Sequence, residues 1–332
     1  MKPIISVIIP VYNEENRIKD CLESIYSQNF DANKVEVLIV DDNSNDKTLE
    51  IVKKFPVKVF KNGKRDYDVG KAIGIENAKG RFLLFIDADN RLIDKTWITR
   101  AVNILEKDND ILGVQSWKLF YSPKHNLATR YQDLFGNTDP AVFYLKNQDH
   151  LQAYENKWEL NGEITEDKKE YVIVKFRANE IPTIGSQGFL TRKIYFEKQK
   201  IFQHIEFFIG LIEKQKDKTG KVCFLKNEVE HLAFSNVGDI TKKFKRNIEH
   251  YLKDEKKGKQ KRYSLNFLKV VLAFFVMITL IVPIYDSFKG YLRKRDNAWF
   301  LHIYLSFIVA WVYGWRIFIE KLSQPFLSKN PS

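Results

Sequence analysis

The chain has 332 residues, of which 44% are hydrophobic and 29% are charged. This balance is typical of a folded protein and excludes an intrinsically disordered chain. The two cysteines, Cys21 and Cys223, lie far apart and form no metal-binding or redox spacing, which indicates reduced thiols. The formal net charge is +12, and residues 242–263 contain ten Lys or Arg residues. Such a run predicts a solvated face, a nucleic-acid arm or a membrane-surface patch.

The N-terminal part of the chain alternates between strand and helix patterns. Strand patterns cover residues 5–12, 35–40, 57–62 and 81–87, and the first of them is a continuous apolar run. Between them, residues 13–29, 46–55 and 69–80 predict helices. This order predicts an α/β fold with a doubly wound, mostly parallel sheet and helices on both faces. In such sheets, ligands bind beyond the carboxyl ends of the strands.

Distinctive residues, most of them polar, stand at three of these strand ends, and we expect them to fall on one edge of the sheet. They are Pro10, Tyr12 and Glu14, then Asp41 and Asp42, then Asp87 and Asp89. The last two carboxylates would repel each other unless a hard divalent cation binds them through oxygen. They therefore predict a metal site, and an Asx-rich turn that caps the next helix is the alternative.

The signal weakens in the middle of the chain. Residues 94–112 predict a helix and residues 113–121 a strand. Residues 122–182 are polar and aromatic with scattered short strands, which favours either an acceptor-side subdomain or a mobile insertion. Order returns over residues 181–196, where two glycines flank a loop formed by Gly185, Ser186, Gln187 and Gly188.

Two apolar runs, residues 268–285 and 298–319, follow the basic stretch. Each has about the length that crosses the hydrocarbon layer, and aromatic residues stand near the ends of the second. With the adjacent basic residues they predict two transmembrane helices in a multi-pass membrane protein. Buried or interfacial helices are the alternative, and the basic residues of 286–297 leave a re-entrant hairpin open. We expect a cytoplasmic catalytic domain, since no signal peptide precedes the first strand.

Three motifs carry a family resemblance: VIIPVYNEE, VLIVDDNSNDKT and FLLFIDADN. Their order and spacing resemble the nucleotide-binding half of family 2 inverting glycosyltransferases, strongly over residues 3–115 and weakly over residues 180–235. The resemblance implies a GT-A fold, a UDP- or GDP-sugar donor, and Mg²⁺ or Mn²⁺ as cofactor. It implies a nucleotide pocket of Pro10, Tyr12, Glu14, Val40, Asp41, Asp42 and Asp87, and metal ligands Asp87, Asp89 and His231. A surface or core histidine is the alternative for His231.

A basic cluster of Lys64, Arg65 and Lys71 precedes the fourth strand. It predicts either a solvated helix face or contact with the donor diphosphate, and on the second interpretation Lys71 belongs to the nucleotide site. The loop from Gly185 to Gly188 resembles the acceptor loop of the family. Its backbone N–H groups, together with Arg192, suit a phosphate group on the acceptor.

The general base is left open by the sequence. Family members with hydroxyl acceptors usually carry a Glu-Asp pair after the acceptor loop, and here the chain reads FQHIEFF. Either Glu206 is the base, with His204 two residues earlier, or the acceptor is a phosphate and needs no strong base. A polyprenyl phosphate is an acceptor of the second kind.

Together these features predict an inverting glycosyltransferase that moves a single sugar to a lipid-linked acceptor at the cytoplasmic membrane face. A polyprenyl phosphate and a lipid-linked glycan both fit, and no nucleic-acid partner is expected. A non-catalytic membrane scaffold or a nucleotidyltransferase is the alternative. The expected boundaries are a GT-A domain over 1–240 (nucleotide half 1–120, acceptor half 121–240), a basic segment over 241–264, transmembrane helices over 265–320 and a tail over 321–332.

Overall fold

The computed structural model describes residues 2–64, 66–197, 204–256 and 267–327. For residues 204–206, 250, 251, 253–256, 267 and 317–327 only the backbone is described. The chain divides into two compact units, and each unit is built from three separate stretches of the sequence. Unit 1 comprises Met1–Phe120, Asp149–Leu151 and Lys157–Ala233, and unit 2 comprises Tyr121–Gln148, Gln152–Asn156 and Phe234–Ser332.

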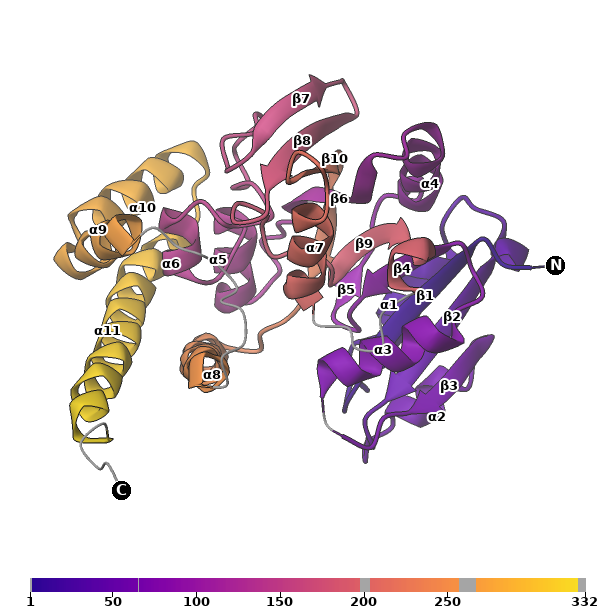
Figure 1. Cartoon of the computed structure of the whole chain (residues 1–332), viewed down its shortest axis with the longest axis horizontal. Coiled ribbons are helices and arrows are strands. Elements are labelled where there is room, and N and C mark those ends of the chain that lie inside the picture. Colours follow the sequence, from indigo (N-terminus) through magenta and orange to yellow (C-terminus); the bar gives the residue numbers. More distant parts are fainter. Residues whose placement is uncertain (1, 65, 198–203, 257–266, 328–332) are drawn as a thin grey trace. The chain divides into compact units, whose positions relative to one another are not determined.

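Unit 1 is built on one large sheet with the strand order β3-β2-β1-β4-β9-β6-β10-β8-β7, and β5 pairs with β10 at its side (Figure 1). The strands are β1 (Ile5–Val11), β2 (Val35–Asp41), β3 (Val57–Lys61), β4 (Phe82–Ile86), β5 (Asn90–Arg91), β6 (Ile111–Leu119), β7 (Glu163–Asp167), β8 (Tyr171–Arg177), β9 (Gln187–Arg192) and β10 (Thr219–His231). Its helices are α1 (Ile18–Tyr26), α2 (Thr48–Val52), α3 (Tyr67–Asn77), α4 (Trp97–Lys107) and α7 (His204–Glu213), with short 3₁₀ turns at Ala32–Lys34 and Lys193–Phe196.

The sheet is mixed rather than mostly parallel. Strands β1 to β4 run parallel, as their alternation with helices predicts. Beyond β4 the direction changes, because β9 pairs antiparallel with both β4 and β6. The parallel order follows from helical crossovers, and the strict alternation of strand and helix stops after α4.

Two apolar layers cover the sheet. One packs α1 and α4 against it through side chains such as Leu22, Ile25 and Trp97, which are buried. The other contains an aromatic group from β4, β9, β10 and α7, including Phe85, Phe189, Phe208 and Phe224. Both layers hold the strands in place, so the carboxyl ends of β1, β2 and β4 form one fixed edge.

Unit 2 is helical and combines a middle segment of the chain with its C-terminal part. Its helices are α5 (Leu127–Phe135), α6 (Pro140–Tyr144), α8 (Val237–Lys256), α9 (Phe267–Thr279), α10 (Ile281–Arg293) and α11 (Leu301–Leu327), with a 3₁₀ turn at Asn297–Phe300. The Phe135 ring of α5 lies 4.7 Å from the Trp299 ring and 4.1 Å from the His302 ring, measured between centroids. The predicted acceptor half, 121–240, is thus divided between the two units.

The two predicted transmembrane helices are not confirmed. Among the described residues, one helical stretch, Asn297–Arg316, is long and apolar enough to cross a membrane. The first apolar run is broken into α9 and α10, which meet at an angle of 73° at Leu280, a residue with φ 59°. The pair counts as at most one further span. Residues 257–264 of the predicted basic segment, residues 265 and 266 of the predicted transmembrane part and the last five residues of the predicted tail lie outside the described part.

Candidate functional site

The paired aspartates follow the buried strand β4 at the edge where β1 and β2 also end. The Asp87 backbone N–H donates to the Ser186 carbonyl at 3.0 Å, and the Asn90 N–H donates to the Asp87 carbonyl at 3.0 Å. The Asp87 carboxylate accepts a hydrogen bond from the Tyr67 hydroxyl, which comes from the first turn of α3. The turn after β4 is therefore held by α3 and by the chain just before β9.

Asp89 lies against β10. Its carboxylate is 3.5 Å from His231 Nε2 and 3.9 Å from Arg17 Nη1, and it accepts from Asn90 Nδ2 at 2.8 Å. Its backbone carbonyl accepts from the Leu232 N–H at 2.8 Å, next to the pairing of β5 with β10. Burial by itself would raise the pKa of Asp89, but His231 and Arg17 outweigh it and lower that pKa below its usual value. The Asp89 carboxylate is therefore ionised at neutral pH.

Glu14 lies in the turn after β1. Asn13 has a left-handed backbone with φ 54°, and the Glu14 N–H donates to Thr48 Oγ1 at 2.7 Å, which fixes the turn. The Glu14 carboxylate accepts from Arg17 Nε at 2.7 Å. Burial, opposed by Arg17 and aided by the Asp89 charge, raises the pKa of Glu14 to about 7. Arg17 therefore stands between two carboxyl groups, of which Asp89 is the more readily ionised.

The ends of β1 and β2 lie side by side. Pro10 pairs with Val40 in the parallel register, and the Asp42 N–H donates to the Val11 carbonyl at 2.9 Å. The buried Asp41 carboxylate accepts from the Ser44 N–H, at 3.2 and 3.3 Å for its two oxygens, and so shapes the turn. Tyr12 is 42% exposed beside this turn. The predicted nucleotide residues of β1 and β2 are thus brought together at one edge.

Lys71 is fully buried in α3 and lies over the Tyr67 ring, with its Nζ 4.4 Å from the ring centroid. Its Nζ donates to the Gly185 carbonyl at 2.6 Å, so the ammonium bonds the predicted acceptor loop. Burial lowers the pKa of Lys71 to about 7. The same helix therefore contacts Asp87 through Tyr67 and the loop through Lys71.

The predicted acceptor loop is shaped by two glycines. Gly185 and Gly188 have φ 108° and 79°, a left-handed region that favours glycine. Gln187 begins β9 and pairs with Ile86, next to Asp87. Its Oε1 atom is buried and has no hydrogen-bond partner among the described residues. Gln187 thus brings this unpartnered amide oxygen to the strand position next to the acidic turn.

Arg192 does not join this cluster. Strand β9 runs antiparallel to β4, so Arg192 pairs with Phe82, at the opposite end of β4 from Asp87. Its guanidinium donates to backbone carbonyls between the end of α4 and the start of β6, including that of Asp108 at 2.9 Å and that of Ile111 at 2.8 Å. The direction of its strand therefore separates Arg192 from the aspartates, and its part in acceptor binding stays a prediction. His204 and Glu206 begin α7, but their side chains lie outside the described residues, so the general base stays a prediction.

The predicted metal ligands are only partly assembled. Across the described residues, no three His, Cys, Asp or Glu side chains are arranged to hold a metal ion. His231 and Asp89 meet, whereas one oxygen of Asp87 is engaged by Tyr67. The donor set itself, two carboxylates and an imidazole nitrogen, suits Mg²⁺ or Mn²⁺. Mg²⁺ usually takes one or two protein carboxylates and completes its shell with water and substrate phosphates.

Sequence reasoning missed Arg17 and Tyr67, which contact the two aspartates. The role of Arg17 could have been predicted from the sequence, because Arg17 stands three residues after Glu14 at the start of a helix. Tyr67 has no sequence signal of its own.

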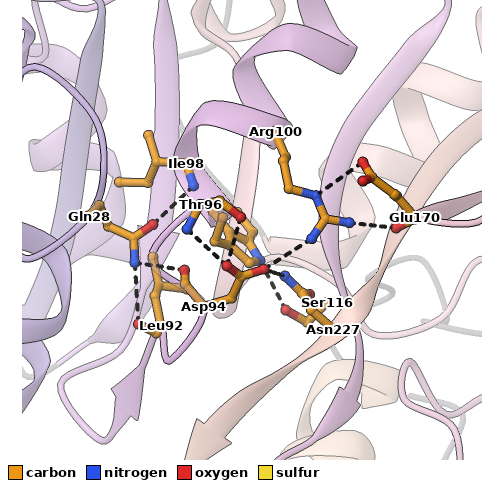
Figure 2. Close-up of polar contacts among 10 residues, drawn as sticks. Gln28, Leu92, Asp94, Thr96, Ile98, Arg100, Ser116, Glu170 and Asn227 are labelled. Atoms are coloured by element: carbon orange, nitrogen blue, oxygen red, sulfur yellow. Dashed lines mark hydrogen bonds and ion pairs between the residues drawn. The ribbon is translucent and has the colours of Figure 1, made fainter.

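A further network, missed as well, fastens the segment after Asp89 (Figure 2). The Asp94 carboxylate accepts from Arg100 Nη1 at 3.0 Å and from Asn227 Nδ2 at 2.9 Å, and Gln28 Nε2 donates to the Asp94 carbonyl at 3.0 Å. The network therefore ties α4, β10 and the turn that follows α1 to this segment.

Comparison with known proteins bears on the fold and on the chemistry. Residues 6–160 match the family model described as glycosyl transferase family 2. The chain is 35% identical over 149 residues to the poly(ribitol-phosphate) beta-N-acetylglucosaminyltransferase TarS of Staphylococcus aureus, across 43% of this chain and 25% of that protein. It is 37% identical over 91 residues to the dolichyl N-acetyl-alpha-D-glucosaminyl phosphate 3-beta-D-2,3-diacetamido-2,3-dideoxy-beta-D-glucuronosyltransferase of Methanococcus voltae, across 25% of this chain and 28% of that protein.

The matched region spans less than half of the length of the curated relatives, between 25% and 46% for TarS of Staphylococcus aureus and AglE of Haloferax volcanii. Among solved structures, the mannosyltransferase PcManGT from Pyrobaculum calidifontis, in complex with GDP-Man and Mn²⁺, has a TM-score of 0.51 with 14% identity. That likeness covers 95% of this chain and 88% of the other. It shows a mixed α/β, GT-A-like fold.

Proposed function

The family match and the glycosyltransferase relatives support the identification of this chain as a transferase enzyme of glycosyl transferase family 2, and from that premise we propose its reaction. The chain transfers a single sugar, with inversion, from a UDP- or GDP-linked donor to a lipid-linked acceptor. A divalent metal ion assists the reaction. The acceptor is a polyprenyl phosphate or a lipid-linked glycan at the cytoplasmic face of a membrane.

The observation that carries this proposal is the gathering of acidic and aromatic side chains at one sheet edge. Tyr12, Asp42 and Asp87 follow three neighbouring parallel strands, and ligands of open α/β sheets bind at such an edge. Asp89 is ionised there and adjoins His231. An edge with this composition suits the ribose, the base and a metal-bound diphosphate of a nucleotide donor.

The two aspartates and His231 would hold the metal ion, which when bound neutralises charge on the departing nucleotide diphosphate. His231 and Arg17, which lie 3.5 Å and 3.9 Å from the Asp89 carboxylate, favour its ionised form, and that form is the one that binds a metal ion. Tyr67 orients Asp87 by donating to one of its oxygens. Support for the metal comes also from the PcManGT complex, which contains Mn²⁺.

The acceptor lies at the loop from Gly185 to Gly188, beside the aspartates. The Ser186 carbonyl bonds the Asp87 N–H, so the loop and the donor site are in contact. The Gln187 side-chain oxygen, which is buried, would accept a hydrogen bond from a hydroxyl group or a water molecule on that side. A lipid-linked acceptor is supported by the relative from Methanococcus voltae, whose name includes a dolichyl-linked sugar phosphate, and by the apolar helices of unit 2.

The test is release of nucleotide by the purified chain in detergent from a panel of UDP- and GDP-sugars, with and without membrane lipid extract. We expect release that requires Mg²⁺ or Mn²⁺ and rises when the extract is added. Asp89→Asn should lose at least about a hundredfold in rate while it stays folded, because a neutral amide binds the metal more weakly and stabilises less charge. The matched control is Asp110→Asn, an exposed carboxylate paired with Lys221.

Nucleotide release that persists in EDTA, or an Asp89→Asn variant as active as Asp110→Asn, would remove the metal from the mechanism. An absence of release from every donor, with thermal stability unchanged by UDP or GDP plus Mn²⁺, would favour a non-catalytic scaffold. Stabilisation by only one of these nucleotides identifies the base, since a ligand that binds the native state raises the unfolding temperature.

A further inference from the structure

Helix α10 buries small residues and exposes large apolar ones, which is the reverse of the pattern in a helix of a water-soluble protein. Its inward face consists of small residues, Pro283, Ser287 and Gly290, all buried. A Cβ added at Gly290 would lie 2.4 Å from the Trp299 ring, so this close packing requires glycine. The large apolar side chains face outward: Ile281, Val282, Ile284, Tyr285, Phe288 and Leu292 are between 37% and 73% exposed. Water is a poor solvent for such a face.

The neighbouring helices of unit 2 extend this apolar surface. Helix α9 exposes Leu272 and Phe275, and α11 exposes a stripe at Tyr304, Phe307, Trp311 and Trp315, spaced by three or four residues. Thirteen of the twenty exposed large apolar side chains among the described residues belong to α9, α10 and α11. Contiguous exposure on this scale marks an interaction surface rather than random surface composition.

The charges near this surface point to an anionic partner. Residues 267–316 contain six basic and two acidic residues. Both acids are engaged within unit 2: Asp286 accepts from the Tyr144 hydroxyl at 3.1 Å, and Asp296 lies 2.9 Å from Arg130 Nε. An apolar surface that carries excess positive charge and stacked tryptophans, here Trp311 and Trp315, suits acyl chains beneath anionic headgroups.

The inward face of α11 argues against a full crossing of the bilayer. His302 Nδ1 and Nε2 lie 2.9 Å from the hydroxyls of Tyr131 and Tyr144, and the Tyr313 hydroxyl donates to Asp139 at 2.6 Å. These contacts extend over roughly 16 Å of helix at 1.5 Å per residue. They bring α5 and α6 alongside α11, and helices of nine and five residues are too short to cross about 30 Å of hydrocarbon. Their ends would be left unsatisfied in lipid.

We propose that α9, α10 and the outer face of α11 insert into one leaflet of an anionic bilayer, so that the chain is held on a single side of the membrane. The partner of this apolar protein surface is the lipid bilayer, and the helices lie at the boundary between its headgroups and acyl chains instead of forming two spans. Unit 2 would bind lipid in this way whether or not unit 1 transfers sugar. The binding experiment therefore fails or succeeds independently of the assay for nucleotide release.

The first test is flotation of the full chain with vesicles of phosphatidylcholine alone or of equimolar phosphatidylcholine and phosphatidylglycerol. We expect stronger flotation with the anionic vesicles, reduced by high salt. The variant Tyr285→Asp with Leu292→Asp should lower the vesicle-bound to free ratio at least about tenfold, since two exposed apolar groups become charged. The control, Ile164→Asp with Ile194→Asp, changes two exposed apolar residues of unit 1 and should float like the parent chain.

Equal flotation of the two double variants would overturn the assignment. So would a parent chain that ignores vesicles and forms a dimer that the Tyr285→Asp, Leu292→Asp variant loses, because the surface would then be an interface between two copies. Circular dichroism of each variant in detergent shows that it is folded, which separates lost binding from lost structure.

The second test distinguishes one-sided attachment from spanning. The first variant, Asn297→Cys, lies between α10 and α11, and the second, Glu50→Cys, lies in unit 1. If the helices form two spans, these two cysteines lie on opposite sides of the bilayer. If the chain is attached on one side, both lie on the same side. The native Cys21 and Cys223 are buried, so the parent chain is the unlabelled control. In sealed membrane vesicles we expect a membrane-impermeant maleimide to modify both variants from the same side. Protection of Asn297→Cys until detergent is added, with Glu50→Cys modified before, would establish a span.

Discussion

At the scale of single residues, Lys71 occupies a position in the candidate site that the sequence did not predict. Lys71 was expected to reach the donor diphosphate or to lie on a solvated helix face. It is fully buried and bonds the Gly185 carbonyl. Burial removes water from the Lys71 ammonium and disfavours its charged form. This effect outweighs the opposing charge of Asp68, so the pKa of Lys71 falls to about 7.

This depressed pKa leads to a prediction on stability. The folded chain binds the Lys71 proton below about pH 7, whereas the unfolded chain keeps it up to the ordinary pKa of 10.5. Between these values the unfolded state binds more protons, so this group makes folding more favourable as the pH rises. The stability of the parent chain relative to Lys71→Met should therefore increase between pH 7 and pH 9, by on the order of 1 kcal/mol per pH unit.

The measurement is urea unfolding of both chains across that range, and the difference between them isolates Lys71 from other titrating groups. A difference that stays constant with pH would show that the ammonium keeps its ordinary pKa in the folded state.

Arg192 and His231 show what the sequence could and could not predict at this scale. His231 was placed in the site by resemblance, and Arg192 was placed there because a phosphate group on the acceptor would bind a cation. His231 does adjoin Asp89, since the end of β10 pairs with β5 directly after the acidic turn. Arg192 lies at the far end of β9 because that strand runs antiparallel, and a strand's direction is not written in its own six residues.

At the scale of elements, the first four strands and their helices were predictable because each is a local pattern. The insertion of β9 between β4 and β6 was not, since it pairs residues about a hundred positions apart. One residue makes that insertion possible. Gly113 of β6 packs under the Phe189 ring of β9, where an added Cβ would lie 2.1 Å from the ring. No motif flags this glycine, because its role depends on a distant partner.

Gly113→Ala should therefore destabilise the chain by about 1–3 kcal/mol, the usual cost of overpacking a core. The matched control is Gly63→Ala, since a Cβ at Gly63 meets nothing within 4 Å. Thermal or urea unfolding of the two variants measures the difference. If Gly113→Ala unfolds at the same denaturant concentration as Gly63→Ala, then β9 does not pack on β6 as described.

At the scale of the whole molecule, the boundaries expected from sequence treated the C-terminal helices as an appendage to a finished domain. The two compact units divide the chain otherwise, because residues 121–148 pack with the C-terminal helices. The buried Tyr131 and Phe135 of α5 contact Trp299 and His302. A weak periodic signal over residues 122–182 concealed this, since α5 and α6 are short and acquire their apolar environment only from a distant part of the chain.

A chain that ends at Asn236 should consequently be poorly soluble, although it retains every strand. Removal of Trp299 and His302 exposes the apolar faces of α5 and α6 to water, and exposed apolar surface favours aggregation. The soluble fraction after expression and the binding of a hydrophobic dye measure this. A matched chain that also replaces residues 122–147 by a Gly/Ser linker should recover solubility, and a soluble, dye-negative chain ending at Asn236 would contradict the division into units.

The bond between the Leu232 N–H and the Asp89 carbonyl has a mechanical consequence. Only Ala233 separates Leu232 from Phe234, the residue at which the chain enters unit 2. A load on the helices of unit 2 would reach the acidic turn most directly through this short connection, which is one of five points at which the chain passes between the two units. Glycine residues inserted between Ala233 and Phe234 would lengthen the connection and weaken this direct transmission.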